Sequence, residues 1–149
     1  MRNEIDEINE ELTKIKFIGD LSPFPVTLKK IISSSESLTK NNNKFLLNVC
    51  VNYGGRQEIV KVAKKLALKS CSGEINPCEV NEELFNSELL TQGIKDPELL
   101  IRTSGEKRIS NFLLWQLAYS EIYISDVLWP DFNEFEFLKA IIDLSLIHI

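Results

Sequence analysis

The chain has 149 residues, of which 44% are hydrophobic and 26% charged, and its formal net charge is -5. These proportions are typical of an ordinary globular protein, and we expect one domain over residues 1–149. A net negative charge argues against a nucleic-acid partner, because general nucleic-acid binders need a basic surface. No apolar run reaches the roughly 18–20 residues that cross a bilayer, and the acidic N-terminus is unlike a signal peptide.

The cysteines and the histidine exclude several kinds of site. Cys50, Cys71 and Cys78 are odd in number, and their spacing fits neither zinc ligation nor a small disulfide framework. We therefore expect a reduced, cytoplasmic protein. The single histidine, His148, is the penultimate residue, so no histidine in the body of the chain is available as a catalytic base or metal ligand.

The first part of the chain predicts a helix, a strand and a second helix. Apolar residues recur at helical spacing among acids within residues 1–13, which is typical of the end of an amphipathic helix. The short apolar run at 15–18 predicts a strand. A second helix begins near Pro23, where a missing N–H is harmless, and runs to Leu38.

Residues Phe45–Val51 form the most strand-like run in the chain, because they are mostly apolar and β-prone. The run is continuous rather than alternating, which predicts burial on both faces, as in a parallel sheet. Gly54-Gly55 would let the chain turn into the helix that follows. Such a unit can bind phosphate, but a lone pair of glycines is weak evidence, and we interpret it as mainly structural.

The rest of the chain continues the alternation of strands and helices. A polar, turn-rich segment at 70–81 is followed by predicted helices at 82–90, 111–119 and 134–144 and by predicted strands at 99–101 and 122–124. This order predicts an α/β fold with a mostly parallel sheet flanked by helices.

Cations gather directly after the strand at 99–101. Arg102 ends that strand, and Lys107, Arg108 and Ser110 follow before the predicted helix. Free N–H groups and the dipole at a helix N-terminus favour an anion. Arginine side chains can each donate two hydrogen bonds to a phosphate, so the pattern predicts an anion site.

A less specific interpretation explains the same residues without a ligand. Arg102 can form an ion pair with Glu106 or Glu98, and Ser110 can be only the N-cap of the helix. The spacing of these residues does not choose between the two interpretations.

The sequence between residues 101 and 132 resembles the C-terminal signature of the cis-prenyltransferases, most closely that of the bacterial undecaprenyl diphosphate synthases. The matching segments are Ile101-Arg102-Thr103-Ser104-Gly105-Glu106, Arg108-Ile109-Ser110-Asn111-Phe112-Leu113-Leu114-Trp115-Gln116, Ala118-Tyr119, Glu121 and Asp126-Val127-Leu128-Trp129-Pro130-Asp131-Phe132. Lys16-Phe17-Ile18-Gly19-Asp20 and Asn52-Tyr53-Gly54-Gly55-Arg56 also match. A match of this length in unbroken register is very specific.

The resemblance implies an enzyme that condenses isopentenyl diphosphate with an allylic prenyl diphosphate, such as farnesyl diphosphate, and forms each new double bond in cis. The bacterial branch makes the undecaprenyl carrier lipid for cell-wall glycans. By position, Arg102, Arg108 and Ser110 match residues that hold the isopentenyl diphosphate, with Ile109 contributing through its backbone. Glu121 matches a carboxylate that helps to bind Mg²⁺. The resemblance also implies a homodimer and peripheral association with the inner face of the membrane through the lipid product.

One position departs from the family pattern. Many bacterial members carry a histidine of the metal site between the residues that match Glu106 and Arg108, and this chain has Lys107 there. A protonated ammonium cannot coordinate Mg²⁺ but can contact a phosphate. We therefore assign Lys107 to diphosphate binding and expect one fewer protein ligand for the metal.

Only the C-terminal portion of the family pattern is present. The motifs of the family's N-terminal half, with the allylic diphosphate loop, the main metal aspartate and the proton-removal motif, do not occur in residues 1–43. The end of the chain, 144–149, is apolar where the family usually carries an arginine-rich tail. We therefore expect a fragment that lacks the first strands and helices of the fold, contains no catalytic residue of its own and is inactive alone.

The alternative is a non-catalytic partner subunit of a cis-prenyltransferase complex. Such subunits typically lose the diphosphate and metal residues. Because Arg102, Arg108, Ser110 and Glu121 are all present, the enzyme interpretation is favoured.

Overall fold

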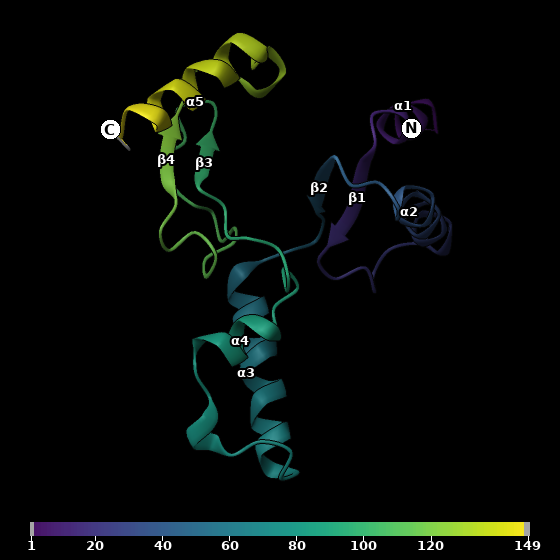
Figure 1. Ribbon diagram of the computed structural model, residues 1–149, viewed down its shortest axis with the longest axis vertical. Coiled ribbons are helices and arrows are strands. Elements are labelled where there is room, and N and C mark those ends of the chain that lie inside the picture. Colours follow the sequence, from purple (N-terminus) through teal and green to yellow (C-terminus); the bar gives the residue numbers. More distant parts are fainter. Residues whose placement is uncertain (1, 148–149) are drawn as a thin grey trace. The chain divides into compact units, whose positions relative to one another are not determined.

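A computed structural model describes residues 2–147 of the chain, with side chains from residue 5 to residue 146 (Figure 1). His148 lies outside this range. The elements in chain order are α1 (Arg2–Glu10), β1 (Thr13–Ile18), α2 (Val26–Thr39), β2 (Phe45–Cys50), α3 (Gly55–Cys71), η1 (Pro77–Glu79), α4 (Glu82–Ser87), β3 (Leu99–Arg102), β4 (Glu121–Ile124), η2 (Trp129–Asp131) and α5 (Glu134–Ile147). Within the described range no helix is long and apolar enough to cross a bilayer.

Two compact units, Met1–Gln92 and Gly93–Ile149, divide the chain, and each is described by itself. Each unit contains one two-stranded sheet, and both pairs of strands, β1–β2 and β3–β4, are parallel. Helices flank the strands in both units. The predicted α/β class with parallel strands is confirmed.

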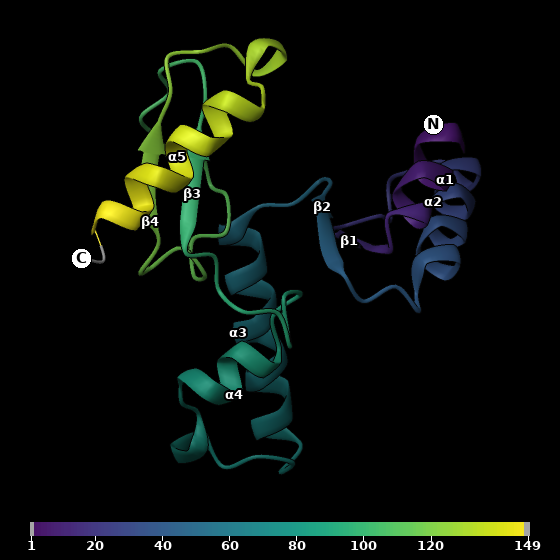
Figure 2. The same cartoon turned by 45° about the horizontal axis from the view of Figure 1, so that its top comes forward.

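The first unit is built on the β1–β2 pair, in which Thr13 lies opposite Phe45 and Ile18 opposite Cys50. Helix α2 packs on β1, and α1 contacts both of them (Figure 2). Ile15, Ile18 and Ile32 are buried there, which removes their apolar surface from water.

The carboxyl ends of β1 and β2 are tied together by a close backbone approach. Gly19 has a φ of +137°, and a Cβ added to it would lie 1.9 Å from the carbonyl oxygen of Val51. The Asp20 N–H donates to the Asn52 carbonyl at 3.3 Å, and Asn52 Nδ2 donates to the Asp20 carbonyl at 2.9 Å. Gly54 is extended, with a φ of -152°, so the turn into α3 depends on Asn52 (φ +46°) rather than on this glycine.

Strand β2 differs from its prediction. Its sequence predicts burial on both faces, yet Phe45, Leu46 and Leu47 are 61%, 45% and 42% exposed. The expectation is wrong for these residues because, within the described range, only β1 pairs with β2.

Two helix boundaries also differ from their predictions. Helix α2 begins at Val26 rather than near Pro23, because the Phe24 N–H closes a turn onto the Leu21 carbonyl and Pro25 is extended before the helix starts. Helix α4 ends at Ser87, three residues earlier than the predicted helix at 82–90.

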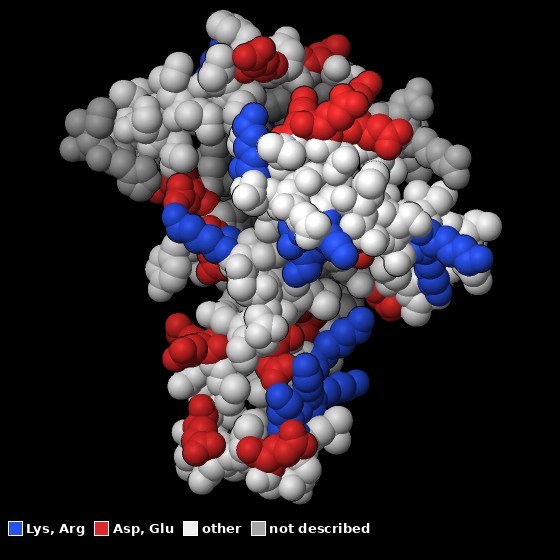
Figure 3. Space-filling view, turned by 45° about the vertical axis from the view of Figure 1, so that its right-hand side comes forward, with Lys and Arg blue, Asp and Glu red and all other residues white. Residues whose placement is uncertain are grey.

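Helices α3 and α4 pack together through a buried acidic side chain. Glu88 is only 7% exposed and forms ion pairs with Lys65 and Lys69 of α3. The two ammonium groups hold the pKa of the Glu88 carboxyl below its usual value. Positive side chains gather on this helical part of the protein, at the bottom of the view (Figure 3).

In the second unit, Leu99 lies opposite Glu121 and Arg102 opposite Ile124 in the parallel pair β3–β4. Helix α5 lies across this pair and packs on β4 (Figure 1), with Ala140 fully buried.

The helix predicted at 111–119 is absent, and that segment forms a series of turns. Ser110, Asn111 and Leu113 have φ values of +56°, +63° and +42°, which a right-handed helix does not allow. Within this irregular segment Gln116 is buried and its apolar neighbours are half-buried.

Candidate functional site

The loop after β3 is fastened to the loop after β4. The N–H groups of Ser104 and Gly105 each donate at 2.9 Å, to the carbonyls of Val127 and Ser125 respectively. In return, the Ser125 N–H donates to the Arg102 carbonyl at 2.8 Å. These bonds fix the start of the cationic loop at the carboxyl ends of both strands, the edge where ligands bind in open parallel sheets.

Two guanidinium groups converge on one carboxylate in this loop. Glu106 Oε2 lies 3.0 Å from Arg108 Nη2 and 4.0 Å from Arg102 Nη2. The Arg102–Glu106 pair anticipated by the less specific interpretation is therefore formed. It does not exclude an anion, because the pair is partly exposed and such pairs are weak in water.

Arg102 and Arg108 differ in their surroundings. The Arg102 side chain is 26% exposed, and its Nε is buried without a hydrogen-bond partner. The Arg108 side chain is 75% exposed. A buried donor that lacks an acceptor costs stability, so an incoming anion that accepted from Arg102 would remove that cost.

The other predicted diphosphate-binding residues lie in the same loop. Lys107 and Ser110 are exposed and Ile109 is half-buried. Because the predicted helix at 111–119 is absent, no helix N-terminus or dipole acts here, and Ser110 is not a helix N-cap. An anion would be held by side chains and loop N–H groups alone.

The backbone of this loop is strained. Ser104, Ser110, Asn111 and Leu113 all have positive φ, which costs about 1 kcal/mol or more at residues other than glycine. Strain of this kind gathers at ligand-binding sites, where the surrounding structure holds the backbone in place.

Glu121 does not lie beside Arg102 in the β3–β4 pair. It is the first residue of β4 and pairs with Leu99, whereas Arg102 pairs with Ile124 at the other end of the strands. Glu121 and the residue opposite Arg102 are three positions apart along β4, which is about 10 Å. Side chains alternate along a strand, so Glu121 also lies on the face opposite to that of Arg102.

The described residues do not form a metal centre by themselves. Within residues 2–147, no three His, Cys, Asp or Glu side chains are placed to hold a metal ion. Magnesium prefers several oxygen ligands, and Glu121 supplies one carboxylate. The described residues therefore offer one ligand rather than a complete Mg²⁺ site.

The sequence pattern predicts Glu106 only as a partner of Arg102 and predicts no role for Asp126. In the structure Glu106 lies closer to Arg108 than to Arg102. Asp126 lies against Gly105, where an added Cβ would come within 3.1 Å of its Oδ1. The position of Asp126 just after an apolar strand was the available signal, since the carboxyl ends of parallel strands meet at one edge.

A separate apolar pocket of about 390 Å³ lies in the first unit, on the face of the β1–β2 pair that α1 and α2 cover. Its lining includes Leu47 and Val49 of β2 and Val51 directly after it, which alternate along the chain and share one face. None of the predicted site residues lines it. The volume lies within the usual range for small-molecule sites.

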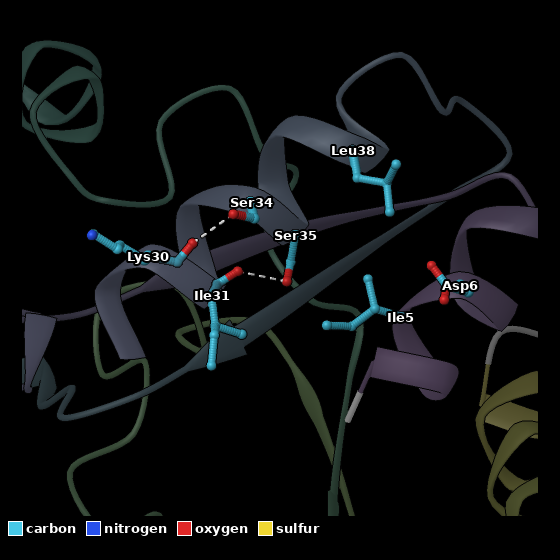
Figure 4. Close-up of a pocket in the computed structure, with 7 residues that line it drawn as sticks. All are labelled: Ile5, Asp6, Lys30, Ile31, Ser34, Ser35 and Leu38. Atoms are coloured by element: carbon cyan, nitrogen blue, oxygen red, sulfur yellow. Dashed lines mark hydrogen bonds between the residues drawn. The ribbon is translucent and has the colours of Figure 1, made fainter. Parts of the chain in front are cut away.

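A more polar hollow of about 430 Å³ lies between α1 and α2 (Figure 4). The serines on its α2 side are already bonded within the helix: Ser34 Oγ donates to the Lys30 carbonyl and Ser35 Oγ to the Ile31 carbonyl, both at 2.8 Å. They offer little to a polar ligand.

The protein is an α/β protein with parallel strands flanked by helices. A cationic loop, held by backbone hydrogen bonds at the carboxyl ends of two strands, gives it a site suited to an anion. A family model described as "Putative undecaprenyl diphosphate synthase" matches residues 1–146. The chain belongs to this family of prenyltransferases.

The relatives agree with this assignment. The chain is 73% identical over 143 residues to an isoprenyl transferase of Prochlorococcus marinus subsp. pastoris, a match that covers 96% of this chain and 53% of the relative. It is 50% identical over 145 residues to a Legionella pneumophila ditrans,polycis-undecaprenyl-diphosphate synthase described as (2E,6E)-farnesyl-diphosphate specific. This match covers 97% of this chain and 61% of the relative.

A solved structure confirms the fold. The crystal structure of lavandulyl diphosphate synthase from Lavandula x intermedia, in complex with dimethylallyl diphosphate, matches with a TM-score of 0.92 at 37% identity. The match covers 96% of this chain and 62% of that one. The chain thus spans between about half and two thirds of the length of these proteins.

Proposed function

We propose that the chain supplies the isopentenyl diphosphate site of a cis-prenyltransferase that makes a long, undecaprenyl-type polyprenyl diphosphate. The observation that carries the proposal is the convergence of Arg102 and Arg108 on one anionic group, the Glu106 carboxylate, at the carboxyl ends of parallel strands. The names of the relatives support it, since one is specific for farnesyl diphosphate and another was crystallised with dimethylallyl diphosphate.

In the proposed reaction the allylic carbon–oxygen bond breaks and diphosphate leaves with the electron pair. The double bond of isopentenyl diphosphate attacks the allylic carbon, and loss of one proton forms the new double bond. Arg102 and Arg108 hold the isopentenyl diphosphate, Lys107 and the Ser110 hydroxyl add donors, and Ile109 contributes its N–H. These charge-assisted bonds orient the attacking double bond. We assign no proton acceptor to this chain.

Mg²⁺ enters the proposal as the ion that neutralises diphosphate charge in this kind of chemistry. Glu121 is proposed as one of its ligands, with the remaining ligands coming from outside the described residues. A lone carboxylate suits Mg²⁺, which is commonly held by one or two carboxylates together with substrate phosphates and water.

The growing prenyl chain needs an apolar environment. We place part of it in the pocket under α1 and α2, whose wall includes Leu47 and Val49. The apolar lining supports this placement, since burying each methylene contributes about 0.8 kcal/mol.

The proposed assembly is a homodimer. On α5, Phe135, Leu138 and Ile142 are 65%, 48% and 58% exposed, and a helix that is apolar on more than one face needs a partner. The proposed location is the cytoplasm, with peripheral attachment to the inner face of the membrane through the lipid product.

A chimaeric enzyme tests the function. The chain would be fused to the part of the Prochlorococcus isoprenyl transferase that the match does not cover, which the resemblance places before it. Farnesyl diphosphate, radiolabelled isopentenyl diphosphate and Mg²⁺ would then be supplied. We expect long polyprenyl products from the chimaera, none from the chain alone, and at least a tenfold loss of rate in Arg102→Ala.

Lys95→Ala is the matched control, because Lys95 is an exposed cation of the same unit that pairs with Glu98 outside the loop. A folded chimaera that makes no product, or one that Arg102→Ala leaves unchanged, would contradict the proposal.

A further inference from the structure

Helix α3 is strongly positive although the chain as a whole is acidic. Five of its six charged residues are lysine or arginine, and the sixth, Glu58, is only 4% exposed. The net charge of the whole chain is -5, so the positive charge of α3 is a local feature, visible as a group of positive side chains on this helical part of the protein (Figure 3). Such an asymmetry orients a protein as it approaches an anionic partner.

Five exposed residues share one face of α3, which we call the outer face. They are Val60, Lys61, Lys64, Ala67 and Leu68, and their spacing places them beside one another on the helix surface. The two large apolar side chains of the face, Val60 and Leu68, are 52% and 71% exposed. The outer face therefore mixes cations with aliphatic side chains and contains no acid.

Lys64 lies at the centre of this face without an acid beside it. Its neighbours three and four positions away along the helix are Val60, Lys61, Ala67 and Leu68. An acid at one of these positions would stabilise the helix, whereas Lys61 and Lys64 repel each other. The outer face would therefore gain stability from an anion that reaches it from outside the helix.

The apolar side chains indicate what kind of anion this is. A nucleic acid or a free phosphate offers no apolar contact to Val60 and Leu68, whereas an anionic lipid surface offers both phosphate groups and acyl chains. The stems of lysine side chains let the ammonium groups stay among the lipid headgroups while Leu68 reaches deeper. Lys61 Nζ lies 3.9 Å from Asp20 Oδ2, but this pair is exposed and weak, so a lipid phosphate can replace it.

We propose that the outer face of α3 docks the protein on an anionic lipid surface, with Lys61 and Lys64 among the headgroups and Val60 and Leu68 at the boundary of the acyl chains. The contact is shallow and reversible, because the face extends over only about 12 Å of helix. The protein itself makes this contact, so it needs no prenyl product and no catalysis. The proposal is therefore separate from the proposed function and from attachment through the lipid product.

Co-sedimentation of the chain with vesicles tests the proposal. The vesicles contain phosphatidylcholine with or without phosphatidylglycerol, and no prenyl lipid. We expect binding that requires phosphatidylglycerol and is lost at about 0.5 M salt, because surface charges are screened there. Lys61→Gln combined with Lys64→Gln should weaken binding about tenfold, and Leu68→Gln about threefold or more. Glutamine is a good helix former, so these variants keep the helix.

Lys40→Gln combined with Lys44→Gln is the matched control, because both lysines are exposed and lie in the loop between α2 and β2 of the same unit. This control should leave the affinity for the vesicles within about twofold of the original. The proposal is overturned if the chain does not bind phosphatidylglycerol vesicles, if it binds equally without phosphatidylglycerol, or if the control weakens binding as much as the α3 lysine variant.

Two further measurements use the same samples. Vesicle binding that Leu68→Gln leaves unchanged, with polyglutamate competing for the face, would assign the face to an acidic protein and overturn the proposal. Pyrophosphate binding reports on the proposed function independently.

Discussion

Arg108 Nη2 lies 3.0 Å from Glu106 Oε2, and the same oxygen is 4.0 Å from Arg102 Nη2. Glu106 thus occupies the position between two guanidinium groups that an incoming diphosphate would need. The diphosphate of a substrate therefore has to displace the Glu106 carboxylate, and the affinity of the site for the substrate depends on that competition.

Replacing Glu106 with glutamine removes the competing charge. We expect Glu106→Gln to bind inorganic pyrophosphate about 2–5 times more tightly than the original chain, since a partly exposed ion pair contributes up to about 1 kcal/mol. Isothermal titration calorimetry at low salt would measure the change. Glu136→Gln is the control, because Glu136 pairs with Lys139 on α5 and its substitution also removes one negative charge. Weaker binding by Glu106→Gln would show that Glu106 helps to hold the anion.

Lys107 occupies the position at which many bacterial members of the family carry a histidine. If its ammonium contacts the diphosphate, Lys107→Ala should weaken pyrophosphate binding about 2–5 fold, as expected for an exposed cation near an anion. Lys95→Ala controls for the loss of one positive charge. Equal effects of the two substitutions would leave Lys107 with no specific role.

Gly19 is the position where the fold most needs a glycine. Gly19→Ala would force a Cβ to within 1.9 Å of the Val51 carbonyl oxygen at a φ of +137°. We expect a loss of about 3 kcal/mol or more in the free energy of unfolding.

Gly73→Ala separates the steric effect from backbone strain. Gly73 has a φ of +78°, but nothing lies within 4 Å of an added Cβ. It should lose only about 1 kcal/mol in urea unfolding. Equal losses at the two positions would refute the close approach of the strand ends.

The Glu88 cluster predicts a pH dependence of stability. Hydrogen bonds from Lys65 and Lys69 lower the pKa of Glu88 below its ordinary value of 4.5. The carboxylate therefore stabilises the fold above that value, and the contribution disappears as the pH falls through the lowered pKa.

Glu88→Gln should accordingly lower the Tm at pH 7 by about 2–5 °C, with the difference shrinking as the pH falls below 4. Differential scanning calorimetry of both proteins from pH 7 to pH 3 measures it. A difference that is independent of pH would mean that packing, not charge, holds α3 and α4 together.

Strands were the most predictable part of this fold. The short apolar runs at β1, β3 and β4 were recognised because each is bounded by polar or turn-forming residues. The helix predicted at 111–119 failed because apolar spacing reports which side chains are buried and says nothing of the positive φ at Ser110 and Asn111. Burial of β2 was overestimated because its pattern reflects neighbours that the described residues do not supply.

The candidate site was predictable in part. Arg102, Lys107, Arg108 and Ser110 were expected in one loop because they are close in sequence, and they lie there. The distance between Glu121 and Arg102 could not be inferred, because it depends on the register that sets Glu121 opposite Leu99.

The most direct test of the central proposal is the affinity of the chain for isopentenyl diphosphate. Calorimetry should show one-site binding that Arg102→Ala and Arg108→Ala each weaken about 10–100 fold, in keeping with charge-assisted bonds to phosphate, while Lys95→Ala changes it less than threefold. Undiminished binding in both arginine variants, or an equal loss in Lys95→Ala, would contradict the assignment of this loop as the diphosphate site.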